Sequence, residues 1–209
     1  MSGASLAVVF AGSGGSGAMT AGSLFLRSAA RAGYYGLMTQ LFGPQVRGGE
    51  AAALVQVSTE PIECQPDRFD LFVALDWEKL DQFAPEIPLD ERSTIIADPA
   101  AGPVSPAIAK SGARVIAVSM SDRNATRLER ALRGRRTNVF AAGLIGALAG
   151  LDTAALRESL AQVLEGKPAD VMQLNAAALS AGIEAADSTD VDASLAPSHR
   201  AARWRITGN

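Results

Sequence analysis

The sequence predicts an α/β fold in which a doubly wound, Rossmann-like sheet is followed by a helical C-terminal part and an extended tail. Three observations support this prediction. Before Asp122, short apolar runs alternate with amphipathic segments, as in layered α/β proteins. Two of these runs, Leu71–Leu75 and Thr94–Ala97, lack polar alternation, which is typical of strands buried on both faces. From Asp122 onward the chain becomes rich in alanine and leucine at helical spacing.

The first predicted strand is Leu6–Ala11, a continuous apolar run. A glycine-dense turn, Gly12-Ser13-Gly14-Gly15-Ser16-Gly17, follows this strand. The turn opens a predicted helix over Ala18–Ala32, where apolar residues recur every three or four positions. Gly33 ends the helix, because glycine readily adopts the left-handed conformation that is common after a last helical residue.

The middle of the chain is predicted to hold five strands and one short helix. The strands share an apolar composition and cover Tyr34–Phe42, Ala51–Val57, Leu71–Leu75, Thr94–Ala97 and Arg114–Val118. The short helix is expected at Trp77–Phe83. Strands and helices therefore continue to alternate, as a doubly wound fold requires.

The last third of the chain is predicted to be helical. Four segments have helical spacing: Asn124–Leu132, Val139–Ala149, Thr153–Leu164 and Ala169–Ala186. No linker between them is long enough to separate two domains, so residues 1–187 are expected to form one domain. Residues 188–209 contain few large apolar side chains, and such a tail is expected to be disordered or laid across a neighbouring subunit.

Composition and charge exclude several classes of protein. The 209 residues are 48% hydrophobic and 20% charged, which is ordinary for a globular protein. A formal net charge of -3 argues against a nucleic-acid-binding protein. The longest apolar stretch, Val139–Leu151, is too short and too rich in glycine to cross a bilayer. Because the first residues also lack the pattern of a signal peptide, we expect a cytoplasmic protein.

Cysteine and histidine occur once each, as Cys64 and His199. One cysteine forms no internal disulfide and supplies no ligand set for zinc or an iron–sulfur cluster. Cys64 could be a reactive thiol, although a lone cysteine near a strand end is more often inert. His199, in a polar tail, is the only available base for a catalytic triad. We therefore expect no catalytic residue and no metal site in this chain.

Two glycine-dense segments form the candidate functional surface. The first is the turn Gly12–Gly17, and the second is Gly43-Pro44-Gln45-Val46-Arg47-Gly48-Gly49-Glu50. Glycine allows another group to approach the backbone closely, and an arginine side chain binds a phosphate or carboxylate through two hydrogen bonds. We expect the two segments to lie close together and to receive a phosphate, a carboxylate or a partner chain. The alternative for Arg47 is a local ion pair, for example with Glu50.

The glycine turn also fits the fingerprint of a dinucleotide site. Gly12, Gly14 and Gly17 have the spacing that admits a pyrophosphate to a helix N-terminus. That fingerprint includes an acid at the end of the second strand, which holds a ribose. Here the second predicted strand ends Thr39-Gln40-Leu41-Phe42, and no acid follows before Glu50. A free-standing NAD(P)-dependent dehydrogenase is therefore an alternative that lacks one of its two signatures.

Several motifs together resemble a known family. They are Gly12-x-Gly-Gly-x-Gly17, Ala21-Gly22, Gly43-Pro44-x-x-Arg47-Gly48-Gly49, the strand Phe69–Asp76, Asn138 leading into Ala142–Leu148, and the helix around Asn175–Gly182. In this order and spacing, the chain resembles the gamma subunit of 2-oxoacid:ferredoxin (acceptor) oxidoreductases, the pyruvate/ketoisovalerate oxidoreductase catalytic domain. The resemblance covers about residues 5–185. Gln45, where many relatives have Glu, and the tail after Asp187 depart from the family pattern.

The resemblance implies a non-catalytic subunit of an enzyme that oxidatively decarboxylates a 2-oxoacid to an acyl-CoA. In that family, thiamine diphosphate with Mg in partner subunits is the electron sink, and iron–sulfur clusters in partners pass electrons to ferredoxin or an NAD-linked acceptor. Residues 1–187, as the gamma domain, would pack on alpha, beta and iron–sulfur subunits and help to form the coenzyme A site. The implied contact residues are Gly12, Gly14, Gly15, Gly17, Arg47, Gly48 and Gly49. Neither a tightly bound cofactor nor a membrane or nucleic-acid partner is expected, and a ligand-free assembly module is a further alternative.

Two more residue sets have alternative explanations. Four arginines share one predicted helical face: Arg123, Arg127, Arg130 and Arg133. Such a face is either simply solvated or docks an acidic partner. Trp204 in the tail is expected to be an interface anchor, because tryptophan is enriched at interfaces.

Overall fold

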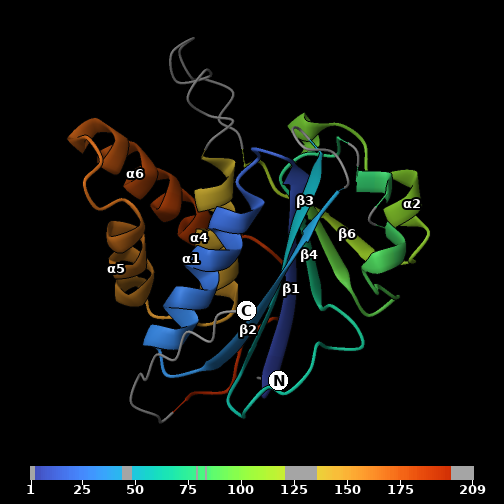
Figure 1. Cartoon of the computed structure of the whole chain (residues 1–209), viewed down its shortest axis with the longest axis horizontal. Coiled ribbons are helices and arrows are strands. Elements are labelled where there is room, and N and C mark those ends of the chain that lie inside the picture. The colour runs from blue at the N-terminus through green and yellow to red at the C-terminus, as the bar shows by residue number, and fades with distance from the viewer. Residues whose placement is uncertain (1–2, 44–48, 79, 83, 121–135, 199–209) are drawn as a thin grey trace.

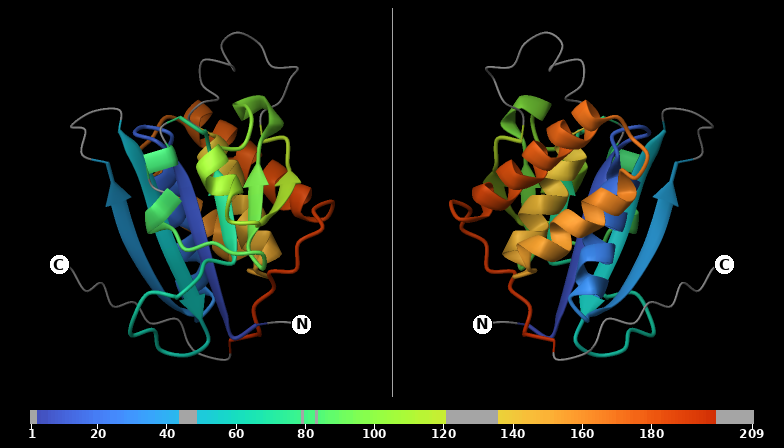
Figure 2. Two further views of the ribbon diagram at one scale, coloured as in Figure 1. Left: turned by 90° about the vertical axis from the view of Figure 1, so that its right-hand side faces the viewer. Right: turned by 90° about the vertical axis from the view of Figure 1, so that its left-hand side faces the viewer.

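A six-stranded mixed sheet forms the centre of the molecule, with helices on both faces (Figures 1 and 2). This computed structural model describes residues 3–43, 49–78, 80–82, 84–120 and 136–198. In chain order the strands are β1 Ser5–Ser13, β2 Tyr35–Phe42, β3 Glu50–Ser58, β4 Leu71–Ala74, β5 Thr94–Ala97 and β6 Arg114–Ala117. Their order across the sheet is β2-β3-β1-β4-β5-β6. The predicted α/β fold is confirmed.

The sheet has a parallel half and an antiparallel half that meet at β1. Strands β1, β4, β5 and β6 pair in parallel, whereas β3 is antiparallel to both β1 and β2. After β1 the chain crosses toward β2, and after β4 it crosses the other way, toward β5. The carboxyl ends of β1 and β4 are thus a topological switch point, where open α/β sheets usually bind their ligands.

Side-chain alternation along β1 divides the core between the two faces. Leu6, Val8 and Phe10 pack on one face, while Ala7 and Val9 pack on the other. The first face is covered by α1 Ala18–Arg31, α4 Thr137–Leu148, α5 Thr153–Val163 and α6 Ala169–Ala186 (Figure 1). The second is covered by α2 Pro106–Ala109 and the 3₁₀ turns Leu80–Gln82, Ala84–Glu86 and Pro99–Ala101. A helix or turn layer on each face explains why the strands carry almost continuous apolar runs.

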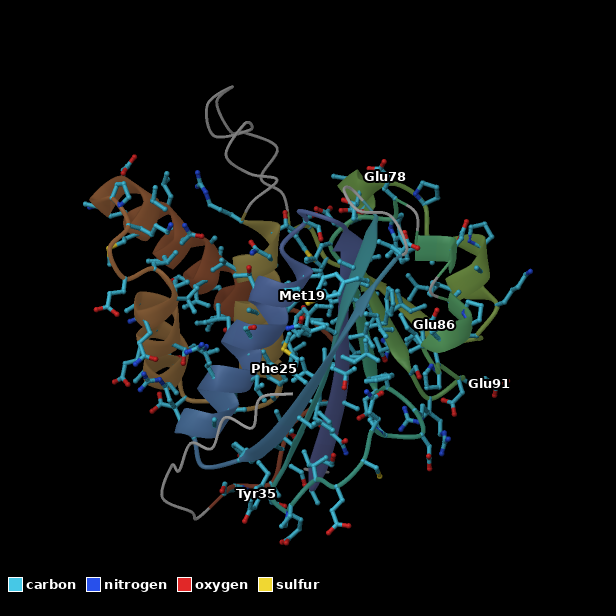
Figure 3. The ribbon with its side chains drawn as sticks, in the orientation of Figure 1. Met19, Phe25, Tyr35, Glu78, Glu86 and Glu91 are labelled. Atoms are coloured by element: carbon cyan, nitrogen blue, oxygen red, sulfur yellow. The ribbon has the colours of Figure 1, made fainter. Side chains whose placement is uncertain are left out.

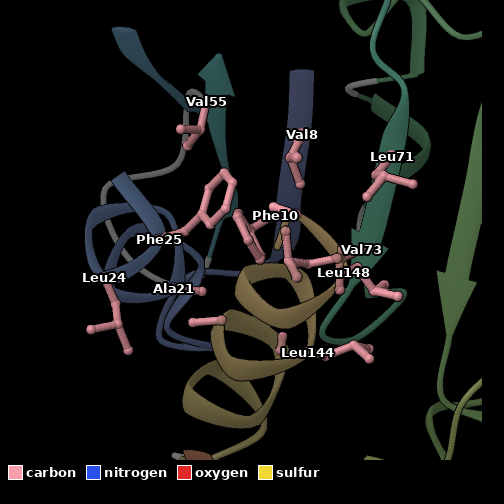
Figure 4. Packing of buried hydrophobic residues seen from close by; sticks show 14 of the residues in the cluster. Val8, Phe10, Ala21, Leu24, Phe25, Val55, Leu71, Val73, Leu144 and Leu148 are labelled. Atoms are coloured by element: carbon pink, nitrogen blue, oxygen red, sulfur yellow. The ribbon is translucent and has the colours of Figure 1, made fainter. Parts of the chain in front are cut away.

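The larger core joins the sheet to α1 and α4. The rings of Phe10 on β1 and Phe25 on α1 are both fully buried, with centroids 6.1 Å apart, and Leu144 of α4 is also fully buried (Figure 4). Close packing continues between α4 and α6, where Gly143 and Gly182 leave no room for a side chain. A Cβ at Gly143 would lie 2.5 Å from the carbonyl oxygen of Leu179, so the two helix backbones are nearly in contact.

The helix predictions for the C-terminal part of the chain are confirmed where the structure describes it. The expected segments Val139–Ala149, Thr153–Leu164 and Ala169–Ala186 correspond to α4, α5 and α6. The single helix expected at Trp77–Phe83 is wrong, because only Leu80–Gln82 forms a 3₁₀ turn there.

Other predictions fall outside the described residues. They concern the helix at Asn124–Leu132, the four arginines Arg123, Arg127, Arg130 and Arg133, and the tail residues His199 and Trp204. Within the described ranges, no helix combines the length and the apolar character that crossing a membrane requires.

The tail from residue 188 to residue 198 packs on its own chain, so the expectation of disorder is wrong for this part, whereas contact with a neighbouring subunit stays a prediction. The backbone N–H of Leu195 donates to the carbonyl oxygen of Ala149 (3.1 Å), and the Tyr34 hydroxyl donates to that of Ala196 (3.0 Å). Ala193 and Leu195 are buried in the larger core. Two buried apolar side chains and several backbone hydrogen bonds therefore hold this polar stretch in place.

Replacing Leu195 with alanine is expected to lower the free energy of unfolding by about 2 to 3 kcal/mol, because it removes a buried side chain that seals the amino end of the sheet. Urea unfolding followed by circular dichroism would measure the change. Pro197→Ala, at an exposed position of the same segment, is the control and should change stability by less than about 0.5 kcal/mol. Equal stability of the two variants would contradict the packing of the tail.

Candidate functional site

The glycine turn lies at the switch point, where it joins the end of β1 to the start of α1. Gly15 has φ +104° and Gly17 has φ +89°, in the left-handed region that glycine adopts without strain. Gly17 is the N-cap of α1 and makes no side-chain cap. The turn consequently presents bare backbone at the helix N-terminus.

The two glycine segments lie close together, as predicted. The backbone N–H of Gly14 donates to the carbonyl oxygen of Gly49, and that of Gly43 donates to the carbonyl oxygen of Glu50 (3.0 Å). The antiparallel register of β1 and β3 places Ser13 opposite Glu50. Arg47 and Gly48 lie outside the described residues, so their roles stay predictions.

Asp76 links the glycine turn to the end of β4 through hydrogen bonds. Its Oδ1 accepts hydrogen bonds from the backbone N–H of Ser13 (2.9 Å) and from that of Glu78 (3.1 Å), and its Oδ2 accepts from the Ser13 hydroxyl (2.8 Å). Asp76 belongs to one of the family motifs, but the sequence predicted no role for it. The signal for that role is its position directly after a buried strand, because parallel strand ends share one edge.

Gly12 and Gly17 are positions where any side chain would collide with a functional group of the site. A Cβ at Gly12 would lie 2.6 Å from Ser16 Oγ and 3.1 Å from Asp76 Oδ2. A Cβ at Gly17 would lie 2.7 Å from Cγ of Asn138, the second residue of α4. These glycines are therefore needed for close packing around the turn as well as for its backbone conformation.

Several buried polar atoms around this edge of the sheet have no hydrogen-bond partner among the residues that the structure describes. On the side of α1 they are Ser16 Oγ and Asn138 Oδ1, and on the side of α2 they are Trp77 Nε1 and Glu50 Oε2. Asn138 is 6% exposed and Glu50 is 2% exposed. Buried polar groups are nearly always paired, so these atoms have room for partners outside the described residues, either in this chain or in a ligand or partner chain.

The sheet topology argues against a dinucleotide site. In dinucleotide-binding folds, the acid that holds the ribose ends a parallel strand next to the first strand. Here β3 lies antiparallel between β1 and β2, so the end of β2 is one strand removed from the glycine turn. The acids near the turn are Asp76, which accepts hydrogen bonds from Ser13, and Glu50, which begins β3 and is buried, and neither ends a second parallel strand beside the first. The NAD(P)-dependent alternative thus also lacks the strand arrangement it requires.

Comparison with known proteins identifies relatives along almost the whole chain. The family model described as pyruvate ferredoxin/flavodoxin oxidoreductase matches residues 7–185. Ketoisovalerate oxidoreductase subunit VorA from Methanothermobacter thermautotrophicus is 28% identical over 178 residues, which are 85% of this chain and 35% of VorA. The chain therefore spans about a third of the length of this curated relative.

Solved structures with the same fold include longer chains and chains of similar length. The 2-oxoglutarate:ferredoxin oxidoreductase from Magnetococcus marinus, with 2-oxoglutarate, coenzyme A and succinyl-CoA bound, matches with a TM-score of 0.77 and 26% identity, over 94% of this chain and 34% of that one. The gamma subunit of a keto/oxoacid ferredoxin oxidoreductase from Geobacter sulfurreducens has a TM-score of 0.63 and 22% identity, over 88% of this chain and 99% of that one. Pyruvate oxidoreductase subunit PORC from Thermotoga maritima has a TM-score of 0.62 and 18% identity, over 87% and 97% of the two chains. The last two likenesses concern the fold alone.

Proposed function

The chain belongs to the pyruvate ferredoxin/flavodoxin oxidoreductase family, and from this premise we propose that it is the gamma-type subunit of a 2-oxoacid:acceptor oxidoreductase. The complete enzyme would oxidatively decarboxylate a 2-oxoacid to an acyl-CoA. Thiamine diphosphate and Mg in partner subunits would provide the electron sink, and iron–sulfur clusters in further partners would carry the electrons to ferredoxin or an NAD-linked acceptor. This chain would supply no catalytic residue.

The lengths of its relatives support the proposal that this chain is one subunit of a larger enzyme. It matches about a third of VorA and a third of the 2-oxoglutarate:ferredoxin oxidoreductase chain, and it covers nearly all of the separate gamma subunit. Residues 1–187 would form the gamma domain, and residues 188–209 would extend it, with the part up to residue 198 sealing the amino end of the sheet. We propose alpha, beta and iron–sulfur subunits as partners, and a cytoplasmic location for the complex.

We propose that this chain contacts coenzyme A, chiefly because polar atoms without described partners lie at the switch point. Gly14 and Gly15 present exposed backbone there, Gly12 and Gly17 flank them, and Gly49 accepts a hydrogen bond from Gly14. Coenzyme A is anionic, so a helix N-terminus and an adjacent arginine suit its phosphates. A relative that matches along this chain was solved with coenzyme A bound. We therefore assign the glycine turn, with Arg47, Gly48 and Gly49, to the coenzyme A site.

Copurification tests the subunit assignment. The native chain, isolated under anaerobic conditions by an affinity tag, should bring with it subunits that contain thiamine diphosphate and iron–sulfur clusters. The copurified complex should reduce a ferredoxin or viologen dye when given a 2-oxoacid and coenzyme A. A chain that runs alone, with neither group in its eluate, would reject the assignment. Tight binding of NAD(P)H would instead revive the dehydrogenase alternative.

Replacing Arg47 with alanine is expected to raise the Michaelis constant of the complex for coenzyme A by about 10- to 100-fold, because a charge-assisted hydrogen bond contributes about 1.5 to 3 kcal/mol. Steady-state kinetics with the intact complex would measure it. Arg114→Ala, at the opposite end of the sheet, is the matched control and should leave that constant unchanged. Dissociation of the complex with unchanged kinetics of the remaining fraction would support the assembly-module alternative.

A further inference from the structure

Two helix N-termini meet beside the glycine turn. Helix α1 has 14 residues and begins after Gly17, and helix α4 has 12 residues and begins after Arg136. Neither N-terminus has a side-chain cap or an acidic residue in its first turn. Each therefore offers unpaired backbone N–H groups and the positive end of a helix dipole. The two helices lie side by side against the same face of the sheet (Figures 1 and 4).

Asn138 joins the two helix starts. Its side chain lies so close over Gly17 that a Cβ there would be 2.7 Å from Asn138 Cγ and 2.9 Å from Asn138 Cβ. The side chain is buried, at 6% exposure, and its amide oxygen Oδ1 has no hydrogen-bond partner among the described residues, so a turn of the amide by 180° would place the NH₂ donor there. Ser16 Oγ, on the turn that leads into α1, is also buried and unpaired. Both groups are able to donate a hydrogen bond, since a serine hydroxyl rotates freely and an amide can turn by 180°.

Arg136 supplies a cationic side chain at the start of α4. It is the N-cap residue of α4, two positions before Asn138. Its Nη2 is shielded from solvent and has no hydrogen-bond partner among the described residues. A guanidinium that is shielded from solvent and has no partner loses hydration without gaining a hydrogen bond. Binding of an anion at this position is therefore favourable.

The carboxylates at this edge do not compete with an anion for the donors of Ser16, Arg136 and Asn138. Both oxygens of Asp76 accept hydrogen bonds, from Ser13 and Glu78. Glu50 belongs by strand alternation to the face of Ala52 and Leu54, on the other side of the sheet from α1. Other acidic side chains, Glu78, Glu86 and Glu91, also lie on the α2 side of the molecule (Figure 3). The edge between the starts of α1 and α4 is therefore the positive side of the site.

We propose that the paired N-termini of α1 and α4 bind a phosphate group, and that Ser16, Arg136 and Asn138 recognise it. The phosphate would bridge N–H groups of both helix starts, with Arg136 as its counter-ion. That this phosphate belongs to coenzyme A rests on the proposed function, whereas the anion site itself rests on the geometry of the two helices. The recognition set thus includes residues more than 100 positions beyond the glycine turn.

Titration calorimetry on the full chain, with inorganic pyrophosphate and with coenzyme A as probes, tests this site. Arg136→Gln is expected to raise the dissociation constant for both probes at least 10-fold, and Asn138→Ala and Ser16→Ala about 5-fold each. The arginine and serine variants each have a matched control away from the site. They are Arg114→Gln, at the amino end of the sheet, and Ser159→Ala, which removes another buried and unpaired hydroxyl, on α5. Both controls should bind within twofold of the parent chain.

Thermal unfolding separates lost binding from lost structure. Asn138→Ala and Ser16→Ala each remove a buried polar group that has an unpaired atom, so their unfolding midpoints should not fall below that of Ser159→Ala. Unchanged affinity for both probes in Arg136→Gln and Ser16→Ala would overturn the anion site and leave the coenzyme A assignment standing. Binding of pyrophosphate without binding of coenzyme A would keep the site and reject that assignment. Failure of both probes to bind the full chain and the copurified complex would reject both.

Discussion

Replacing Gly182 with alanine is expected to lower the free energy of unfolding by about 3 kcal/mol, although alanine is the better helix former. Gly182 lies within α6, where the exchange would normally gain about 1 kcal/mol of helix propensity. Here the new Cβ would overlap the carbonyl oxygen of Phe140 and lie 2.9 Å from its carbonyl carbon and 3.0 Å from the backbone nitrogen of Leu144. All three are backbone atoms of α4, so no rotamer change relieves the overlap. The helices must separate, and overpacking of this kind outweighs the propensity gain.

Chemical denaturation of Gly182→Ala would measure this loss, with Ala181→Val as the control on the neighbouring, exposed position of α6. The control should lose less than about 1 kcal/mol, because valine costs only its lower helix propensity there. A gain of stability in Gly182→Ala would show that α4 and α6 are farther apart than this structure places them.

Replacing Gly17 with alanine is expected to combine a stability loss of about 3 kcal/mol with at least a 10-fold weaker affinity for coenzyme A. Two physical causes act together. The residue has φ +89°, which costs an L-amino acid about 1 to 2 kcal/mol. Its Cβ would also displace the buried amide of Asn138, which contacts the start of α1. The first cause affects folding alone, and the second affects folding and the proposed phosphate site.

Gly15→Ala separates these two causes. Gly15 has a similar left-handed backbone, φ +104°, but no atom lies within 4 Å of the place that a Cβ would take. Its alanine variant should lose about 1 to 2 kcal/mol of stability and bind coenzyme A more tightly than Gly17→Ala does. Calorimetric titration and urea unfolding of the same two proteins would provide both values. Equal effects in the two variants would mean that Asn138 contributes nothing to the site.

Local patterns in the sequence predicted most secondary-structure elements, because strand and helix periodicity are local properties. The glycine turn is the clearest example, since an apolar strand, a run of glycines and a helical segment follow one another without a break. The same turn and the Arg47-Gly48-Gly49 segment also carried the family resemblance, which the family match over residues 7–185 confirms. The segment at Trp77–Phe83 shows the limit of this method, because seven residues are too few to establish a period.

Other features of the site depend on contacts between distant parts of the chain. Asn138 lies 121 positions after Gly17, and only the packing of α4 against α1 brings the two together. The partners of Asp76 likewise depend on the parallel pairing of β1 and β4. The tail was expected to leave the molecule, yet Ala193 and Leu195 find a buried position that no local pattern reveals.

The sequence by itself determined the α/β class, most of the strands and helices, the glycine turn and the family, because each is encoded by short-range periodicity or by motifs. Tertiary structure alone decided that β3 enters between β1 and β2, since an apolar strand is able to pair with any neighbour that buries it. That insertion removes the place where a dinucleotide fold holds its ribose and brings Glu50 beside Ser13. Tertiary packing also placed the start of α4 beside the start of α1. The proposed phosphate site depends on this packing, because two helix N-termini from distant segments share one ligand only when they lie side by side.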